Sequence, residues 1–317
     1  MIARRNAGYP LAVLIELPDL PLPGRGATAE RLRGLTALGR ADLVACRLAE
    51  GHADAVAIRA ELGDACPPGD QDHAVGEVRW GVWAATPASV RAEPGPEGWL
   101  LTGDRPWCSG AAWCTDALVT AAADDGIRLF AVRNDGPYAQ PLDGTWPAIG
   151  MSGSDSRTVR FTGVPARPVG GPGDYVDRPG FWHGGVGVAA CWYGGALAVA
   201  DTLHAAARAR ELGPHALAHL GAIDVAAGAV LDQAAARIDA EPGADAHRLA
   251  LRVRATVEHA ATEVIDRVGR ALGAGPLCRD NNHAQRIADL TVYLRQSHAE
   301  SDLEQLGRLL ATEESPW

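Results

Sequence analysis

The hydrophobic pattern of this chain changes twice along its length, and these changes limit the fold more than any single motif. In residues 28–62, apolar side chains recur every three or four positions, which is typical of helix. From about 77 to 170 the sequence shows short strand-like runs separated by Gly and Asp turns, with no helical stretch between them. After about residue 180 the helical pattern returns. This order predicts helices, then a compact antiparallel barrel or sandwich, then helices.

Turn signals place the boundaries between these zones. The stretch "GDACPPGDQDH" at 63–73 separates the first helical zone from the strands. Asp125-Gly126 joins two strand-like runs and predicts a hairpin, because Gly tolerates a positive φ. The stretch "RTVRFTGV" at 157–164 alternates with a period of two and predicts another strand.

The helical segments at the end of the chain are of similar length and are joined by short turns, which predicts an antiparallel four-helix bundle. These segments span roughly 185–211, 215–240, 246–272 and 281–311. We therefore expect three regions. They are an N-terminal helical region at 1–75, a middle β-domain at 76–175 and a C-terminal four-helix bundle at 176–317.

Composition excludes several classes of function. The net charge of −10 argues against a nucleic-acid partner, and all 29 basic residues are Arg, so lysine chemistry is absent. The six cysteines show no CxxC spacing, and we expect no metal site. The apolar run near the N-terminus is short and carries Glu16, and no stretch reaches the about 20 apolar residues of a membrane span. We expect a cytoplasmic protein with no membrane partner.

The stretch "GGVGVAACWYGG" at 184–195 contains Gly185-x-Gly187-x-x-Ala190, which matches a dinucleotide-binding pattern. That pattern works only where a strand leads into it and a helix begins after it. No strand signal precedes it here, and the chain has no parallel β-α repeat. The small residues are better explained by the close approach of helices in the bundle.

The stretch "TGDRPWCSGAAWCTDALV" at 102–119 places Trp107 and Trp113 close together in a loop, beside two cysteines and a serine. Three interpretations compete for it. The loop covers a flat ligand, binds a metal, or belongs to the core of the β-domain.

With "GWLLTG" before this loop, "WPAIGMSGSDSRTVRFTGVP" after it and a helical bundle at the end, the chain resembles the acyl-CoA dehydrogenase superfamily from about 77 to 310. The resemblance implies an α+β fold with a short N-terminal helical region, a middle antiparallel β-barrel and a C-terminal four-helix bundle. It also implies bound FAD, and a homodimer or homotetramer, because the family buries its flavin at a subunit interface.

The resemblance assigns flavin contacts to the loop. Trp107 matches the aromatic residue beside the isoalloxazine ring, Ser109 matches the hydroxyl residue near flavin N5, and Cys108 lies between them. The chemistry agrees, because an indole binds a flat and partly apolar ring well and a hydroxyl can donate to its polar edge. The alternative is that Trp107 and Trp113 are plain β-domain core.

Other flavin contacts match the family only in part. Ala85 opens "ATPA", where relatives commonly read Thr-Glu-Pro-Gly, so that backbone contacts alone would remain. Arg210, followed by Leu-Gly, stands where relatives have an Arg and a Phe-Gly that hold the adenine and pyrophosphate. Gly273 and Gly275 in "LGAGP" stand for a Gly-Gly-x-Gly turn.

The largest departure from the family concerns the catalytic base. A dehydrogenase of this type needs a carboxylate to remove the α-proton of the thioester. At the usual position near the end of the bundle this chain has Ser297 or His298, and a second known position in "RPGFWHGGVGVAA" also has no carboxylate.

Three explanations compete for the missing base. Glu300, or Glu304 one turn later, serves as the base if the register is shifted. His298 acts as the acid or base, or is merely the surface partner of Asp302 one helical turn away. Alternatively, dehydrogenation has been lost. Flavin monooxygenases of the dibenzothiophene type, which share this fold, also lack the glutamate.

The sequence thus predicts an FAD-dependent, acyl-CoA dehydrogenase-like flavoprotein oxidoreductase. Its substrate would be an acyl-CoA, a carrier-bound acyl group or a related small organic molecule, and an electron-transfer protein would be its partner. Two alternatives remain open: a flavin-dependent monooxygenase on the same fold, and a non-catalytic scaffold or assembly subunit.

Overall fold

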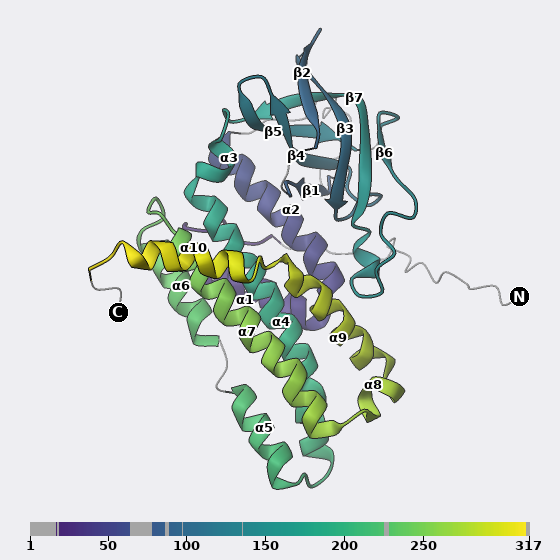
Figure 1. Ribbon diagram of the computed structural model, residues 1–317, viewed down its shortest axis with the longest axis vertical. Coiled ribbons are helices and arrows are strands. Elements are labelled where there is room, and N and C mark those ends of the chain that lie inside the picture. The colour runs from purple at the N-terminus through teal and green to yellow at the C-terminus, as the bar shows by residue number, and fades with distance from the viewer. Residues whose placement is uncertain are drawn as a thin grey trace, which may run out of the picture. The chain divides into compact units, whose positions relative to one another are not determined.

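The computed structural model describes residues 17, 19–63, 78–85, 89–96, 98–134, 136–224 and 228–314 (Figure 1). The described chain forms two compact units. The barrel unit contains Gly51–Ala148 and Ser152–Asp174, and the helical unit contains Asp19–Glu50, Ile149–Met151 and the chain from Tyr175 onward. This division differs from the three predicted regions, because the N-terminal helices are shared between the two units. The change from the barrel to the last helices falls at Asp174.

The barrel unit is a sheet that closes on itself. Its path runs β1-β4-β2-β3-β7-β5, and a further pairing of β5 with β4 returns the last strand to an earlier one. The predicted β-barrel is confirmed. The strands are β1 (Trp80–Trp83), β2 (Arg91–Gly95), β3 (Gly98–Cys108), β4 (Asp116–Ala123), β5 (Gly126–Arg133), β6 (Ala139–Pro141) and β7 (Arg157–Val169).

Two features of the sheet test the strand predictions. β4 and β5 form the expected hairpin, with Ala123 opposite Gly126 and Gly126 at φ +131°. β7 covers the predicted strand and continues to Val169. The sheet is not wholly antiparallel, however, because β1 runs parallel to β4. The chain passes through β2 and β3 between these strands, and such a crossover allows a parallel pair.

The side chains that face the interior of the barrel form one buried apolar cluster. Large members are Trp83, Leu101, Phe130 and Phe161, each no more than 1% exposed. At about 25 cal/mol for each Å² of apolar surface, burying one such side chain contributes about 1.5–3 kcal/mol. The barrel is therefore filled by side chains, and ligands must bind at its outside or its ends.

The predicted helix over 28–62 is two helices, α1 (Thr28–Ala41) and α2 (Leu43–Leu62). Between them, Asp42 is extended, with φ −154° and ψ 114°. Its carboxylate accepts a hydrogen bond of 2.9 Å from the backbone N–H of Ala45. An aspartate in this role caps the start of a new helix, which explains the break.

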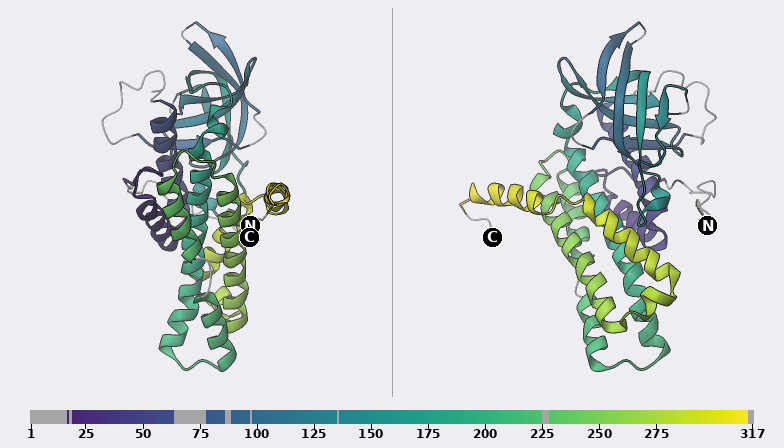
Figure 2. Two further views of the ribbon diagram at one scale, coloured as in Figure 1. Left: turned by 90° about the vertical axis from the view of Figure 1, so that its left-hand side faces the viewer. Right: turned by 45° about the vertical axis from the view of Figure 1, so that its right-hand side comes forward.

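The remaining helices follow the expected order. The segment predicted over 215–240 is described as α5 (Pro214–Asp224) and α6 (Gly228–Ala240), with residues 225–227 outside the described residues, and the segment predicted over 281–311 does not form one helix. It is broken by a short 3-10 turn, η3 (Leu294–Gln296), and by Ala299 at φ +47°. After the break, α10 leaves the direction of α9 (Figure 2). The other helical elements are η2 (Ser152–Ser154), α3 (Asp174–Asp177), α4 (Pro179–Ala209), α5 (Pro214–Asp224), α6 (Gly228–Ala240), α7 (His247–Leu272), α8 (Gly275–Arg279), α9 (Asn281–Tyr293) and α10 (Glu300–Ala311).

Two stretches are long and apolar enough to cross a membrane by length and composition alone: α4, and the stretch from Pro214 to Ala240. In α4, 72% of the apolar window is buried inside the protein, whereas the second window is 13% buried. A long apolar helix that is mostly buried has the pattern of a bundle core. The structure therefore explains the apolar character of α4 by its place among the other helices.

Glycines allow α1 and α4 to pack closely. A Cβ atom at Gly194 would lie 2.2 Å from the carbonyl oxygen of Thr36, and one at Gly39 would lie 2.6 Å from that of Cys191. The pattern from Gly185 to Ala190 lies inside α4, with no strand leading into it, so it is not a dinucleotide-binding turn. Its small residues belong to a helix that packs against other helices, as the sequence suggested.

We expect Gly194→Ala to lower the free energy of unfolding by about 1–3 kcal/mol, because the added methyl group overlaps backbone atoms that cannot move aside. Gly185→Ala is the matched control, since its Cβ would lie 3.6 Å from the nearest atom, a side-chain carbon of Arg254. The control should be neutral or more stable by up to about 1 kcal/mol. Urea unfolding of the two variants measures the difference, and equal stabilities would contradict the close packing.

A buried histidine joins α9 to α4. His283 is 2% exposed, and its Nδ1 atom shares a hydrogen bond of 2.8 Å with the hydroxyl of Thr202. Burial lowers the pKa of His283, Asp280 opposes this shift and Arg286 adds to it. The folded protein therefore holds a proton on this ring less tightly than the unfolded chain does.

This pKa shift predicts a pH dependence of stability. The stabilising contribution of neutral His283 is complete above about pH 6.5, the pKa of an unfolded histidine, and is lost as the pH falls through the lower folded pKa. Between pH 7.5 and pH 5, we expect the free energy of unfolding to fall less in His283→Asn than in the wild type. Urea unfolding at the two pH values tests this, and an equal loss in both proteins would rule it out.

Candidate functional site

An exposed tryptophan marks one end of the barrel. Trp107 lies near the end of β3 and is 61% exposed, although it is a large apolar side chain. The pairing of β3 with β7 shifts register between Arg105 and Cys108, which is the mark of a β-bulge. Trp107 also has φ +65°, a conformation that costs a branched or bulky residue about 1–3 kcal/mol. The bulge and this backbone conformation together turn the indole out of the barrel.

A second indole lies beside Trp107. The ring of Trp146 meets it edge to face, with 6.0 Å between the ring centroids and 84° between the ring planes. Aromatic pairs favour this arrangement, which contributes about 0.5–1.5 kcal/mol. Trp146 thus supports the exposed position of Trp107.

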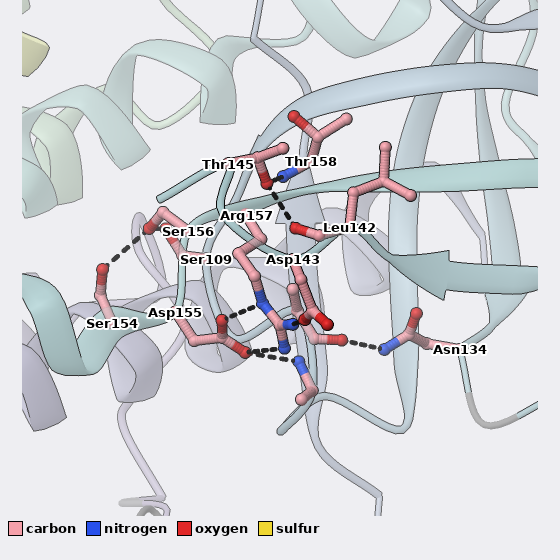
Figure 3. Close-up of polar contacts among 12 residues, drawn as sticks. Ser109, Asn134, Leu142, Asp143, Thr145, Ser154, Asp155, Ser156, Arg157 and Thr158 are labelled. Atoms are coloured by element: carbon pink, nitrogen blue, oxygen red, sulfur yellow. Dashed lines mark hydrogen bonds and ion pairs between the residues drawn. The ribbon is translucent and has the colours of Figure 1, made fainter. Parts of the chain in front are cut away.

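Three serine hydroxyls form a hydrogen-bonded chain next to this tryptophan (Figure 3). The hydroxyls of Ser109 and Ser156 are 2.8 Å apart, and so are those of Ser156 and Ser154. Ser154 and Ser156 are buried, whereas Ser109 is half-buried. The buried pair therefore orients the hydroxyl of Ser109, which is the member of the chain that is closest to solvent.

The loop that carries Ser109 is docked onto the segment before β7. The backbone N–H of Gly110 donates to the carbonyl oxygen of Ser154 at 2.7 Å, and that of Ala111 donates to Asp155 at 3.1 Å. The carboxylate of Asp155 accepts from the N–H of Ala112 at 2.8 Å and pairs with Arg157 at 2.6 Å (Figure 3). Asp155 has φ +45°, so a second strained residue is held in this site.

Buried polar side chains hold the same loop from inside the barrel. The indole N–H of Trp83 donates to the carbonyl oxygen of Ser109 at 3.0 Å. The amide of Asn134 donates to the carbonyl oxygens of Ala111 and Cys114, both at 2.8 Å. The backbone of the loop is thereby fixed at both of its ends, and the exposed groups of the site are presented by a rigid frame.

Beneath the loop, a buried arginine supports Trp83. Arg105 is fully buried, and its Nε donates to the carbonyl oxygen of Trp83 at 3.0 Å. Its Nη2 donates to the hydroxyl of Thr120 at 2.8 Å. The sequence analysis assigned no role to Asn134, Ser154, Asp155 or Ser156. Only the repeated serines of "SGSDS" and the Asn that ends a strand gave any signal of their roles. Arg105 was a candidate to meet a CoA phosphate, and its complete burial contradicts that role.

The structure places the other predicted barrel residues differently. Cys108 is fully buried, its thiol lies 3.2 Å from the carbonyl oxygen of Arg105, and burial raises the pKa of that thiol. Its side chain belongs to the core, and only its backbone reaches the site. Ala85 is exposed after β1, whereas residues 86–88 lie outside the described residues.

Trp113 differs from Trp107. It is half-buried, packs against the apolar cluster of the barrel, and lies under the guanidinium of Arg79 at 5.6 Å. Arg79 also donates to the carbonyl oxygen of Trp113 at 2.7 Å. The core interpretation therefore describes Trp113 but not Trp107, which is exposed, and the interpretation of Trp107 as a ligand-covering residue stays a prediction.

The residues predicted from the family's nucleotide contacts lie in the helical unit. Arg210 is exposed and ends α4. Gly273 ends α7 with φ +66°, which explains this glycine as a helix C-cap, and Gly275 begins α8. A Cβ atom at either glycine would meet no atom of the described chain within 4 Å.

The candidates for the catalytic base come together where α9 gives way to α10. The hydroxyl of Ser297 accepts from the N–H of Ala299 at 3.2 Å, so Ser297 serves the turn. The side chain of His298 is 71% exposed, and its Nδ1 lies 3.2 Å from the Oδ1 of Asp302. Glu300 is exposed in the first turn of α10. This arrangement matches the interpretation of His298 as a surface partner of Asp302.

The carboxylate of Asp302 is buried and contacts two side chains, His298 and Arg254. Besides His298, it faces Arg254, whose Nε lies 3.9 Å away. Arg254 lies over the ring of Trp192 at 4.7 Å and donates to the carbonyl oxygen of Gln296 at 3.1 Å. Burial lowers the pKa of Arg254 and Asp302 opposes that shift.

The remaining acid of this segment, Glu304, is half-exposed at its side chain and pairs with Arg308. None of the three carboxylates, Glu300, Asp302 and Glu304, combines burial with freedom to accept a proton. Among the residues that the structure describes, no group of three His, Cys, Asp or Glu side chains could hold a metal ion.

Comparisons with known proteins give a structural match only. No protein-family model matches the chain, and no curated protein matches it significantly. The dibenzothiophene monooxygenase TdsC from Paenibacillus sp. A11-2 matches with a TM-score of 0.75 and 21% identity, over 89% of this chain and 83% of that chain. The nitrososynthase from Micromonospora carbonacea var. africana matches with a TM-score of 0.75 and 21% identity, over 94% and 87% of the two chains.

A third match is the methanesulfinate monooxygenase MsuC from Pseudomonas fluorescens, with a TM-score of 0.73 and 15% identity over 91% of this chain and 84% of that one. The chain has an acyl-CoA dehydrogenase-like fold. N-terminal helices, a middle β-barrel and a C-terminal helical region are its parts, as the sequence predicted. Within this fold the site at the end of the barrel is formed by Trp107, Ser109 and the segment that holds them.

We expect Asn134→Ala to loosen this site, because two backbone carbonyls lose their donor. The free energy of unfolding should fall by about 1–3 kcal/mol, and amide hydrogens of residues 110–114 should exchange faster. Asp143→Ala is the control, since Asp143 is almost fully exposed and pairs with Arg157 at the surface. It should cost less than about 1 kcal/mol. Hydrogen exchange by mass spectrometry reads both variants, and unchanged exchange in Asn134→Ala would contradict the role of this amide.

Proposed function

We propose that this protein is a flavin-dependent monooxygenase that uses reduced FMN and molecular oxygen. The exposed Trp107, held in a strained conformation beside the oriented hydroxyl of Ser109, carries the flavin part of the proposal. A flat apolar indole suits one face of a tricyclic ring, and a hydroxyl that other serines orient suits its polar edge. These residues fit a flavin because the indole is exposed, the hydroxyl is held by other serines and both have the right chemistry.

The choice of a monooxygenase over an acyl-CoA dehydrogenase rests on the acids near α10. Dehydrogenation of a thioester requires a carboxylate that can accept a proton. Asp302 is held by Arg254 and His298, and Glu300 is solvated. The monooxygenase alternative needs no such base. The acyl thioester substrate and the electron-transfer partner expected from the sequence belong to the less supported reading.

The named functions of the similar structures agree with this choice. TdsC is described as a dibenzothiophene monooxygenase and as FMN-bound, MsuC as a methanesulfinate monooxygenase, and KijD3 as a complex with FMN. The adenosine half of FAD would have to use Arg210, which is exposed at the end of α4, and the glycines at 273 and 275, which match the family's glycine turn only in part. We therefore propose FMN in place of the FAD expected from the sequence.

When bound, reduced flavin supplies two electrons to dioxygen, so that one oxygen atom enters the substrate and the other leaves as water. We infer that the oxygen acceptor is a sulfur or nitrogen centre of a small organic molecule, as the names of the similar proteins suggest. In this reading Trp107 binds the ring, Ser109 orients it, and Ser156 and Ser154 keep the hydroxyl of Ser109 in place.

Oxygen uptake tests the proposal. Purified protein with chemically reduced FMN and dibenzothiophene or an aromatic amine should consume oxygen, and labelled dioxygen should place one labelled atom in the product. Oxidised flavin on the protein should not be bleached by octanoyl-CoA without oxygen. Bleaching by the thioester would establish the dehydrogenase instead. Failure to bind either FMN or FAD would favour the non-catalytic scaffold.

Two variants connect this activity to the site. Trp107→Ala should weaken FMN binding about tenfold, since an aromatic contact contributes about 0.5–1.5 kcal/mol. Tyr138→Ala is the control, because Tyr138 is also an exposed aromatic residue of the barrel unit, 53% exposed, outside the Trp107–Ser109 loop. Flavin fluorescence titration measures both affinities. Equal affinities would remove Trp107 from the flavin site.

A further inference from the structure

A second cleft lies wholly within the helical unit. It is bounded by α1, α4 and α6, which pack side by side (Figure 2), and has a volume of about 550 Å³. Binding sites for small molecules commonly measure about 300–1,000 Å³. The site at the end of the barrel does not include any of its residues.

The walls of the cleft are mainly apolar. Leu32 and Ala37 of α1, Leu197 of α4 and Leu231 of α6 supply most of them. Leu32 and Leu231 are nearly buried, whereas Ala37 is exposed at the rim. Apolar surface of this kind gains free energy when a ligand displaces water from it.

The charged groups around the cleft are paired with one another. Arg40 donates to both carboxylate oxygens of Asp201, at 2.9 and 2.6 Å. Arg33 lies 3.9 Å from Asp232, across from α1 to α6. Each arginine thus has an acidic partner, and the cleft presents no uncompensated charge. A charged ligand would gain no ionic partner there, so the cleft favours an uncharged one.

One polar group remains available in the cleft. The hydroxyl of Thr36 already donates to the carbonyl oxygen of Ala190 at 3.2 Å. The hydroxyl of Tyr193 has no hydrogen-bond partner in the part of the chain that the structure describes, and it lies 3.0 Å from the place where a Cβ atom of Gly228 would be. A side chain at position 228 would crowd this hydroxyl, and glycine avoids that contact.

The protonation state of Tyr193 sets its role. Burial and the nearby carboxylate of Asp224 raise the pKa of this phenol, Arg40 opposes them and Asp232 adds to them. Tyr193 therefore stays protonated at neutral pH and has an O–H to donate.

We propose that the cleft between α1, α4 and α6 binds an uncharged, mostly apolar small molecule that carries one hydrogen-bond acceptor, such as a ketone, and that Tyr193 donates to that acceptor. The apolar walls supply most of the affinity, and the phenol selects ligands with a carbonyl group. This site is independent of the proposed flavin site and requires no cofactor.

A fluorescent ketone tests the proposal. The probe is 6-propionyl-2-(dimethylamino)naphthalene, which is uncharged, has one carbonyl and changes its emission with the polarity of its surroundings. The comparison compound is 6-propyl-2-(dimethylamino)naphthalene, which lacks the carbonyl. Both are titrated against the full chain without flavin. The ketone should bind more tightly than the comparison compound, about fivefold for one hydrogen bond of about 1 kcal/mol.

Variants locate the probe. Tyr193→Phe should remove the fivefold preference and leave the affinity for the comparison compound unchanged. Ala37→Trp fills the cleft from an exposed position and should abolish binding of both compounds. Glu30→Trp, an exposed position of α1 that does not line the cleft, is its control and should bind as the wild type does.

Several results would overturn this assignment. A preference for the ketone that persists in Tyr193→Phe would exclude the phenol as the donor. Binding that survives in Ala37→Trp, or that disappears in Trp107→Ala, would place the probe elsewhere, in the second case at the end of the barrel. Because no flavin is present in this experiment, its outcome does not depend on whether the chain is a monooxygenase.

Discussion

The bulge in β3 is the constraint on which the candidate site depends. It places Trp107 at a positive φ and turns an indole into solvent, an arrangement that costs about 1–3 kcal/mol in backbone strain. Hydrogen bonds from Trp83 and Asn134 to the loop that follows, at about 1 kcal/mol each, offset this cost. These buried hydrogen-bond donors hold Trp107 in its strained conformation. Backbone strain of this kind is common at binding sites, and the candidate site here combines an indole with an oriented hydroxyl.

The helical unit shows why the fold alone does not decide the chemistry. The acyl-CoA dehydrogenase-like architecture accommodates more than one reaction, so the chemistry depends on the residues of the site. At the junction of α9 and α10, the carboxylate of Asp302 contacts Arg254 and His298. These contacts connect the start of α10 to α7.

The two glycines at the crossing of α1 and α4 affect more than packing. Gly39 and Gly194 bring the two backbones close together, while Gly228 at the start of α6 leaves room before the hydroxyl of Tyr193. The cleft lies beside this crossing, because Thr36, Arg40 and Tyr193, which line it, are close in sequence to these two glycines. The proposed ligand site therefore depends on the glycines of the unit as well as on the side chains that line the cleft.

The sequence by itself determined the order of helices, barrel strands and helices and the hairpin at Gly126, because periodicity and turn residues act locally. The sequence also contains the helix cap at Asp42, which divides the predicted helix over 28–62. The predicted helix over 281–311 is wrong because Ala299 adopts a positive φ that no propensity indicates. Only the tertiary structure decided that Trp113 packs against the core while Trp107 is exposed, and that Cys108 points inward. The serine chain, the Asn134 bonds and the pairing of Asp302 with Arg254 join residues distant in sequence, so their positions depend on how the strands and helices pack.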